Sequence, residues 1–149
     1  MPAFVQEKLI RFQHCDPAGL IFYPKAFELG GEVIEDWFTC FAGRTPHAFH
    51  AVEHKSLPTV KTTCEFFGQI HVSDLLSYEL VVEEIGQSSV NVAITASKDG
   101  QPRYRMSSTL VQVGRKSDGR YGALAFADDM REALERYRRQ PAEASGEGA

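Results

Sequence analysis

The stretch His14–Pro24 combines a carboxylate with the start of a helix, two features that can act together on a substrate. Asp16 is followed by a Pro-Ala-Gly turn sequence and by an apolar run that leads into Pro24. A helix is predicted to begin at Pro24, because proline fits the first turn, where its missing N–H breaks no bond. Tyr23 before it lacks the side-chain oxygen of a good N-cap residue. The helix would therefore start with bare N–H groups that can hold negative charge while Asp16 does the chemistry.

The neighbours of Asp16 allow other interpretations of the same stretch. The carboxylate could instead accept hydrogen bonds from the turn at Ala18 and Gly19, but the full motif and the uncapped helix favour the catalytic role. Cys15 is a poor candidate nucleophile because a neighbouring carboxylate raises the pKa of a thiol. His14 could tune Asp16 or contact a substrate, or it could be satisfied by backbone groups at the end of a strand.

The pattern of apolar residues indicates the elements that must hold this loop. One strand, a long helix, four strands and a final helix predict an α+β fold, in which an antiparallel five-stranded sheet wraps around a long buried helix. Asp99-Gly100 is a hairpin signal between two of the strands. The predicted elements are strands over 4–12, 59–70, 75–85, 90–96 and 104–113, helices over 24–41 and 130–137, and a short helix capped by Thr45-Pro46 that runs to His54.

The long helix carries apolar residues around most of its circumference, which is typical of a helix buried on all sides. Gly30 and Gly31 in its middle each cost about 1 kcal/mol of helix stability relative to alanine. We therefore expect the backbone to approach another element closely at both glycines. Gly43 is expected to end the helix.

Composition sets wider limits on the protein. The 149 residues, 43% hydrophobic and 24% charged, predict one domain over residues 1–140 and a disordered polar tail over 141–149. A net charge of -4 without a dense basic run argues against a nucleic-acid partner. Three widely spaced cysteines and the lack of a signal-peptide pattern fit the cytoplasm. No apolar run approaches the roughly 20 residues that span a membrane, and no cofactor is expected.

The sequence Asp-Pro-Ala-Gly-Leu-Ile-Phe-Tyr-Pro over 16–24 resembles the first loop of hotdog-fold acyl-CoA thioesterases. The match is greatest to the 4-hydroxybenzoyl-CoA thioesterase group with an aspartate in that loop, and it extends over residues 4–113. The resemblance implies a hotdog fold and hydrolysis of an aromatic, hydroxybenzoyl-like acyl-CoA to the free acid and coenzyme A. It also implies a homodimer, or a homotetramer built as a dimer of dimers, with sites between subunits.

The resemblance assigns roles to individual residues. Asp16 would be the catalytic carboxylate, as nucleophile or as general base, and the Tyr23 N–H would be the oxyanion donor. A thioester needs this combination, because its thiolate leaves easily while its carbonyl oxygen must be stabilised as it gains charge. The residues expected to bind the substrate are Gly19, His47, Leu57, Pro58, Thr59, Ser88 and Ser89.

Two basic features remain open. The turn at 86–88 lacks the Arg or Lys with which some family members hold the CoA phosphates, so the candidates lie elsewhere: Lys61, Arg103, Arg105, Arg115 and Lys116. His47, His50 and His54 would share one helix face, which could hold a zinc ion. A polar helix face near the substrate entrance is the favoured interpretation, and no metal site is predicted.

Two other functions are compatible with a hotdog domain. A hydratase or dehydratase acting on acyl thioesters would favour a His or Glu pair deep in the tunnel, and Asp16 has no evident histidine in that pattern. A non-catalytic module that binds acyl thioesters or aromatic ligands would keep the pocket and tolerate loss of the carboxylate.

Overall fold

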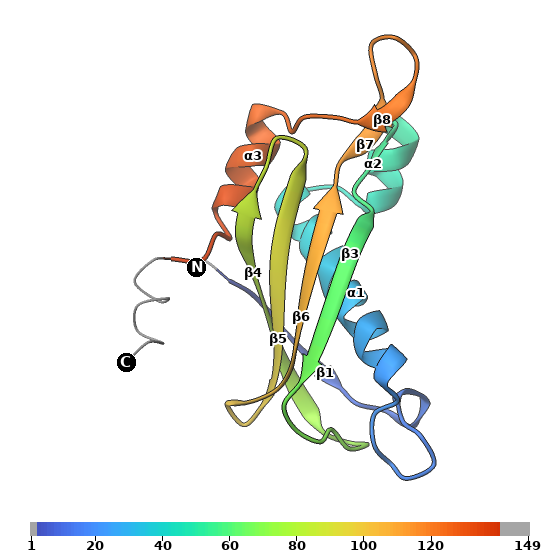
Figure 1. Ribbon diagram of the computed structural model, residues 1–149, viewed down its shortest axis with the longest axis vertical. Helices are drawn as coiled ribbons and strands as arrows, with labels where there is room; N and C mark the ends of the chain where they lie inside the picture. Colours follow the sequence, from blue (N-terminus) through green and yellow to red (C-terminus); the bar gives the residue numbers. More distant parts are fainter. Residues whose placement is uncertain (1–2, 141–149) are drawn as a thin grey trace.

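The computed structural model describes residues 3–140, in which one antiparallel sheet carries a long helix on one face (Figure 1). The sheet order is β1-β4-β5-β6-β3, and every neighbouring pair is antiparallel. Its strands are β1 (Phe4–Leu9), β3 (Thr59–Phe66), β4 (Leu75–Ile85), β5 (Ser89–Lys98) and β6 (Gln101–Val111). This confirms the predicted α+β class and the five-stranded sheet.

Helix α1 (Tyr23–Ala42) begins one residue earlier than predicted, with Phe22 at the N-cap position and Pro24 in the first turn. No side chain caps this end of the helix. Gly43 ends α1 as predicted, in the left-handed conformation with a φ of 70°, and its N–H donates to the Thr39 carbonyl. Local signals therefore set both ends of the helix.

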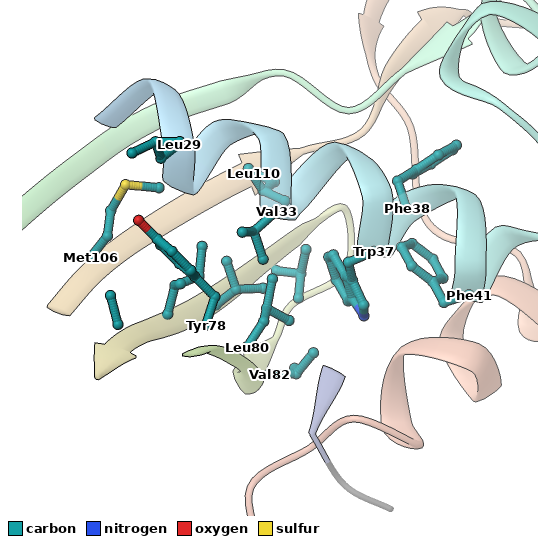
Figure 2. Close-up of a cluster of buried hydrophobic side chains, with 14 of the residues drawn as sticks. Leu29, Val33, Trp37, Phe38, Phe41, Tyr78, Leu80, Val82, Met106 and Leu110 are labelled. Carbon is teal, nitrogen blue, oxygen red and sulfur yellow. The ribbon is translucent and has the colours of Figure 1, made fainter. Parts of the chain in front are cut away.

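The core lies between α1 and the sheet. Figure 2 shows Leu29, Val33 and Trp37 on α1 facing side chains that rise from the strands. Trp37 has no exposed surface, and burial of such a side chain contributes about 1.5–3 kcal/mol. The facing residues from the sheet are Tyr78, Leu80, Val82, Met106 and Leu110.

The prediction that α1 is buried on all sides is wrong. One face of the helix packs on the sheet, while Glu28, Glu32 and Asp36 lie exposed on the other. Two of these carboxylates face basic or polar groups of β1, since Lys8 Nζ lies 2.9 Å from Glu32 Oε1 and Gln6 donates to Asp36. Apolar residues at the edges of the buried face make that face wider, but they do not extend around the whole helix.

The two central glycines of α1 differ from each other. A Cβ atom on Gly30 would lie 2.5 Å from Cε of Met106 on β6, so the predicted close approach is confirmed there. A Cβ atom on Gly31 would meet nothing within 4 Å, so the prediction of close approach is wrong for Gly31.

The remaining elements follow the sequence pattern with shifted ends. β1 is shorter than predicted, and a 3-10 helix, η1 (Phe12–His14), follows it. α2 (Pro46–Glu53) is capped by Thr45, whose hydroxyl accepts the Ala48 N–H at 3.1 Å. The Asp99-Gly100 hairpin is confirmed, with positive φ angles of 50° and 78°. β3 ends at Phe66 rather than at residue 70.

A small second sheet was not predicted. It consists of β2 (Lys55–Ser56), β7 (Val113–Arg115) and β8 (Tyr121–Ala123), in the order β2-β7-β8. α3 (Asp128–Glu135) starts before and ends before the predicted helix. The predicted tail over 141–149 lies outside the described residues. Within residues 3–140, no helix combines the length and the apolar character that a bilayer crossing requires.

Candidate active site

The loop between β1 and α1 is held in place by the segment that follows β3. The N–H of Ile21 donates to the Ile70 carbonyl at 2.9 Å, and the N–H of Val72 donates to the Gly19 carbonyl at 3.0 Å. Gly19 has a φ of 81°, a left-handed conformation that favours glycine. These bonds fix the loop against the body of the protein on the side of residues 70–72.

Asp16 lies half-buried within this loop. Its Oδ1 accepts hydrogen bonds from the N–H groups of Ala18 at 2.9 Å and Leu20 at 3.2 Å, so the turn-forming role considered for this carboxylate is present. Within residues 3–140, Oδ2 has no hydrogen-bonding partner. One oxygen therefore orients the carboxylate, and the other is available to a substrate or a water molecule.

The first N–H of α1 is also available. The Phe22 N–H donates to the His14 carbonyl at 2.9 Å, Pro24 has no N–H, and the Lys25 N–H donates to the Phe22 carbonyl at 2.8 Å. In the part of the chain that the structure describes, the Tyr23 N–H has no acceptor. It lies at the positive end of the helix dipole, where a developing negative charge is stabilised.

The aromatic side chains at this helix end point into solvent. Phe22 is 49% exposed and Tyr23 is 63% exposed, and their ring centroids lie 5.9 Å apart. Exposed apolar side chains that adjoin one another form a surface on which a ligand or partner can pack. The pair provides an apolar surface next to the Tyr23 N–H.

His14 and Cys15 take structural places in the loop. His14 is buried, and its Nδ1 accepts the Arg11 N–H at 2.9 Å, so the backbone satisfies this histidine. Burial is the main cause that lowers the pKa of His14, which favours the neutral ring. Burial, followed by the charge of Asp16, raises the pKa of the Cys15 thiol, as expected for an unreactive cysteine.

An ion pair next to the end of β1, with a buried carboxylate, was not predicted from the sequence. Asp74 is 8% exposed, and its carboxylate accepts the His71 N–H at 2.8 Å and lies 2.8 Å from Lys98 Nζ. Burial acts to raise the pKa of Asp74, but the His71 hydrogen bond and the Lys98 ammonium together outweigh it and lower the pKa. The Asp74 carbonyl also accepts the Ile10 N–H at 2.8 Å, which connects the pair to the end of β1.

The predicted substrate-binding residues of the β2–β3 connection line a cavity. Leu57, Pro58 and Thr59 surround a space of about 260 Å³ together with residues of α1 and α2. The other residues that line it are Gly31, Ile34, Glu35, Phe38, Pro46, Phe49 and Ser56. His47 does not line this cavity; it is exposed on α2.

Ser88 and Ser89 lie at the β4–β5 turn, close to the same end of β6. The Val111 N–H donates to the Pro58 carbonyl at 3.0 Å, and the Gln112 N–H donates to the Ser88 carbonyl at 2.7 Å. A basic residue at this turn was not predicted from the sequence: Arg131 of α3 donates to the Gly86 carbonyl at 2.8 Å. Among residues 3–140, no three His, Cys, Asp or Glu side chains are grouped as metal ligands.

The two groups of predicted site residues lie at opposite ends of α1 (Figure 1). Asp16, Gly19 and Tyr23 occupy the loop before the helix, whereas the start of β3 lies beside α2 at the far end. A single copy of the chain therefore does not bring the candidate carboxylate and the cavity together.

Comparisons with known proteins find similarity in structure. No protein-family model matches the sequence, and no curated protein matches it. A 4-hydroxybenzoyl CoA thioesterase from Pseudomonas sp. strain CBS-3 is 19% identical with a TM-score of 0.78, and the alignment covers 88% of this chain and 98% of that one. A 1,4-dihydroxy-2-naphthoyl-CoA thioesterase from Synechocystis is 17% identical with a TM-score of 0.77, over 89% and 95% of the two chains.

A third similar structure contains a ligand. It is a 4-hydroxybenzoyl CoA thioesterase mutant, an aspartate replaced by asparagine, in complex with 4-hydroxybenzoyl CoA. It is 18% identical to this chain with a TM-score of 0.80, and the alignment covers 90% of this chain and 99% of that one. These neighbours are hotdog-fold thioesterases, and the chain described here has the hotdog fold.

Proposed function

We propose that this protein is an acyl-CoA thioesterase that hydrolyses an aromatic acyl-CoA to the free acid and coenzyme A. The observation that carries the proposal is the pair of unused groups in one loop, Asp16 Oδ2 and the Tyr23 N–H. The similar structures named for aromatic acyl-CoA thioesterases support the choice of substrate class.

In the proposed reaction the Tyr23 N–H donates to the thioester carbonyl oxygen. As the carbonyl carbon is attacked, that oxygen gains negative charge next to the N-terminus of α1, and one such donor is worth about 2.7–4 kcal/mol in known oxyanion holes. Stabilising the oxyanion therefore requires no positively charged side chain at the N-terminus of α1.

Asp16 provides the second part of the proposed reaction. It either removes a proton from the water that attacks the carbonyl carbon, or attacks that carbon itself to give an anhydride that water then opens. In both routes the C–S bond breaks, coenzyme A leaves as the thiolate, and one water molecule is added across the bond. The proton from that water ends on the thiolate or in solvent.

The proposed site is completed by a second copy of the chain. β3 is an edge strand, and its residues are exposed except for half-buried Cys64. Within residues 3–140, no strand pairs with its outer edge. Antiparallel pairing of two β3 strands would place the Asp16 loop of each copy beside the partner's cavity and would cover this edge.

Arg131 extends the proposal to the nucleotide. It lies over the β4–β5 turn at which some family members place a basic residue, and it supplies there the positive charge that the turn sequence lacks. We assign the CoA phosphates to this arginine ahead of Arg105, whose guanidinium lies 2.9 Å from Glu83.

The test is the hydrolysis of benzoyl-CoA by the purified protein and by Asp16→Asn. The asparagine carbonyl can still accept the Ala18 and Leu20 N–H groups, so the loop keeps its shape while the charge is lost. We expect kcat to fall by roughly 10²–10⁴-fold with little change in KM. Asp118→Asn is the matched control, because Asp118 accepts the Arg120 N–H at 2.9 Å in a similar turn far from the site.

Two results would contradict the proposal. One is an unchanged kcat for Asp16→Asn, and the other is tight binding of acyl-CoA by the native protein without turnover, which would favour a binding module.

A mixture of Asp16→Asn with Thr59→Trp, a change at the cavity, tests the shared site. Mixed dimers would restore about a quarter of the native activity, whereas a site built within one chain would restore none.

A further inference from the structure

The cavity beside the start of β3 has an unusual wall, because part of it is bare helix backbone. Gly31 lines the cavity from the exposed face of α1, and a Cβ atom there would meet nothing within 4 Å. Ile34 and Phe38 follow it along the helix, and Phe49 of α2 and Leu57 face it. The cavity is mostly apolar, with Glu35 as its charged residue.

Within the described chain, packing does not require a glycine at position 31. Gly30 is needed for the close approach of α1 to Met106, but Gly31 has a helical backbone and open space where a side chain would stand. Alanine there would be more favourable for the helix. The open space next to Gly31 is therefore available to a molecule that enters the cavity.

The size of the space indicates the kind of molecule. An apolar cavity of roughly 150 Å³ is enough to hold benzene. The cavity here measures about 260 Å³, which leaves room for more than one ring. Its mostly apolar walls match a hydrophobic group.

We propose that this cavity is the acyl pocket, that it accepts two-ring aromatic acyl groups, and that Gly31 determines this size preference. The inference rests on the proposed function and narrows its substrate class from aromatic acyl groups in general to bicyclic ones. In the proposed dimer, the thioester lies at Asp16 and Tyr23 of one copy, and the acyl group enters the cavity of the other.

The test compares 2-naphthoyl-CoA with benzoyl-CoA for the native protein, Gly31→Ala and Gly31→Leu. We expect Gly31→Leu to lower the kcat/KM ratio of naphthoyl to benzoyl substrate at least tenfold, and Gly31→Ala to lower it less. Gly31→Ala should also raise the melting temperature by about 2 °C, because alanine favours the helix. Thr39→Leu is the control, since Thr39 is exposed on α1 but does not line the cavity.

A binding experiment separates this inference from the proposed function. Fluorescence titration with 2-naphthoate should show binding to the native protein and a loss of at least tenfold in affinity for Gly31→Leu, whether or not any acyl-CoA is hydrolysed. An unchanged substrate ratio and unchanged naphthoate affinity in a folded Gly31→Leu protein would overturn the inference. The inference would also be overturned if Gly31→Leu changed only the sedimentation coefficient of the protein and neither the substrate ratio nor the naphthoate affinity. That result would mean that a second copy of the chain fills the space.

Discussion

The two buried tyrosines under α1 allow a prediction whose size can be worked out from single atoms. Tyr78 and Tyr104 have no exposed surface, and their hydroxyl oxygens are 2.6 Å apart. The Tyr104 hydroxyl donates to the Ala26 carbonyl at 3.1 Å, so its one proton is used there. Tyr78 must therefore donate to Tyr104, and burial raises the pKa of both phenols, which keeps both protons in place.

The direction of these hydrogen bonds makes the two tyrosines unequal. Tyr104→Phe removes the bond to Ala26 and leaves the buried Tyr78 hydroxyl without an acceptor, at about 1 kcal/mol for the bond and about 1–3 kcal/mol for the stranded group. We expect a loss of about 2–4 kcal/mol in the free energy of unfolding. Tyr78→Phe leaves the Tyr104–Ala26 bond intact and should cost about 1 kcal/mol.

The double variant Tyr78→Phe/Tyr104→Phe tests the reasoning directly. It leaves no hydroxyl without a partner, because both hydroxyls are removed, and the Ala26 carbonyl can keep the hydrogen bond of its own helix. Its loss in the free energy of unfolding should therefore be smaller than the sum of the two single losses by about 1 kcal/mol or more. Urea unfolding followed by far-UV circular dichroism measures all four proteins, at one protein concentration and with equal m values. Strict additivity, or a loss below about 0.5 kcal/mol for Tyr104→Phe, would refute the assigned bond directions.

Two further predictions concern the loop and the helix. The pKa of Asp74 is lowered in the folded protein, so the stability it contributes is present above the unfolded pKa of about 3.9 and is lost as the pH falls through the lower folded value. Chemical denaturation from pH 6 to pH 2 should show this loss, and Lys98→Met should reduce it; identical acid profiles would contradict the role of the pair. Gly30→Ala should lower the free energy of unfolding by about 0–2 kcal/mol, because moving Met106 to admit the Cβ atom costs about 1–3 kcal/mol and alanine favours the helix by about 1 kcal/mol. A melting temperature above that of the native protein would show that the end of the Met106 side chain moves freely.

Local chemistry made much of the fold predictable. Turn and cap residues act within a few positions of the chain, so Thr45, Gly43 and the Asp99-Gly100 hairpin could be assigned from the sequence, and all three are confirmed. The bounds of β4 are as predicted, because alternation of apolar residues reflects its one buried face. The first residue of α1 is Tyr23, one position before the predicted start, since Pro24 is compatible with more than one position in the first turn.

Features that depend on distant segments were not predictable in this way. Gly30 and Gly31 are equivalent in sequence, and only the position of Met106 on β6 makes them different. Arg131 reaches the β4–β5 turn from α3, and Lys98 reaches Asp74 across the sheet. No periodicity or spacing reports such pairs, because they are set by how the elements pack.

The Asp16 loop shows both kinds of information in one place. The order of residues from Asp16 to Pro24 is sufficient to specify a turn with a carboxylate and an uncapped helix start, since turns and helix ends depend on neighbours in the chain. Which groups remain unbonded is a matter of packing. The Phe22 N–H donates to the His14 carbonyl, and the Tyr23 N–H has no acceptor among the described residues. The cavity lies farther along α1, from Gly31 to Phe38. Both depend on segments that meet only in the folded protein.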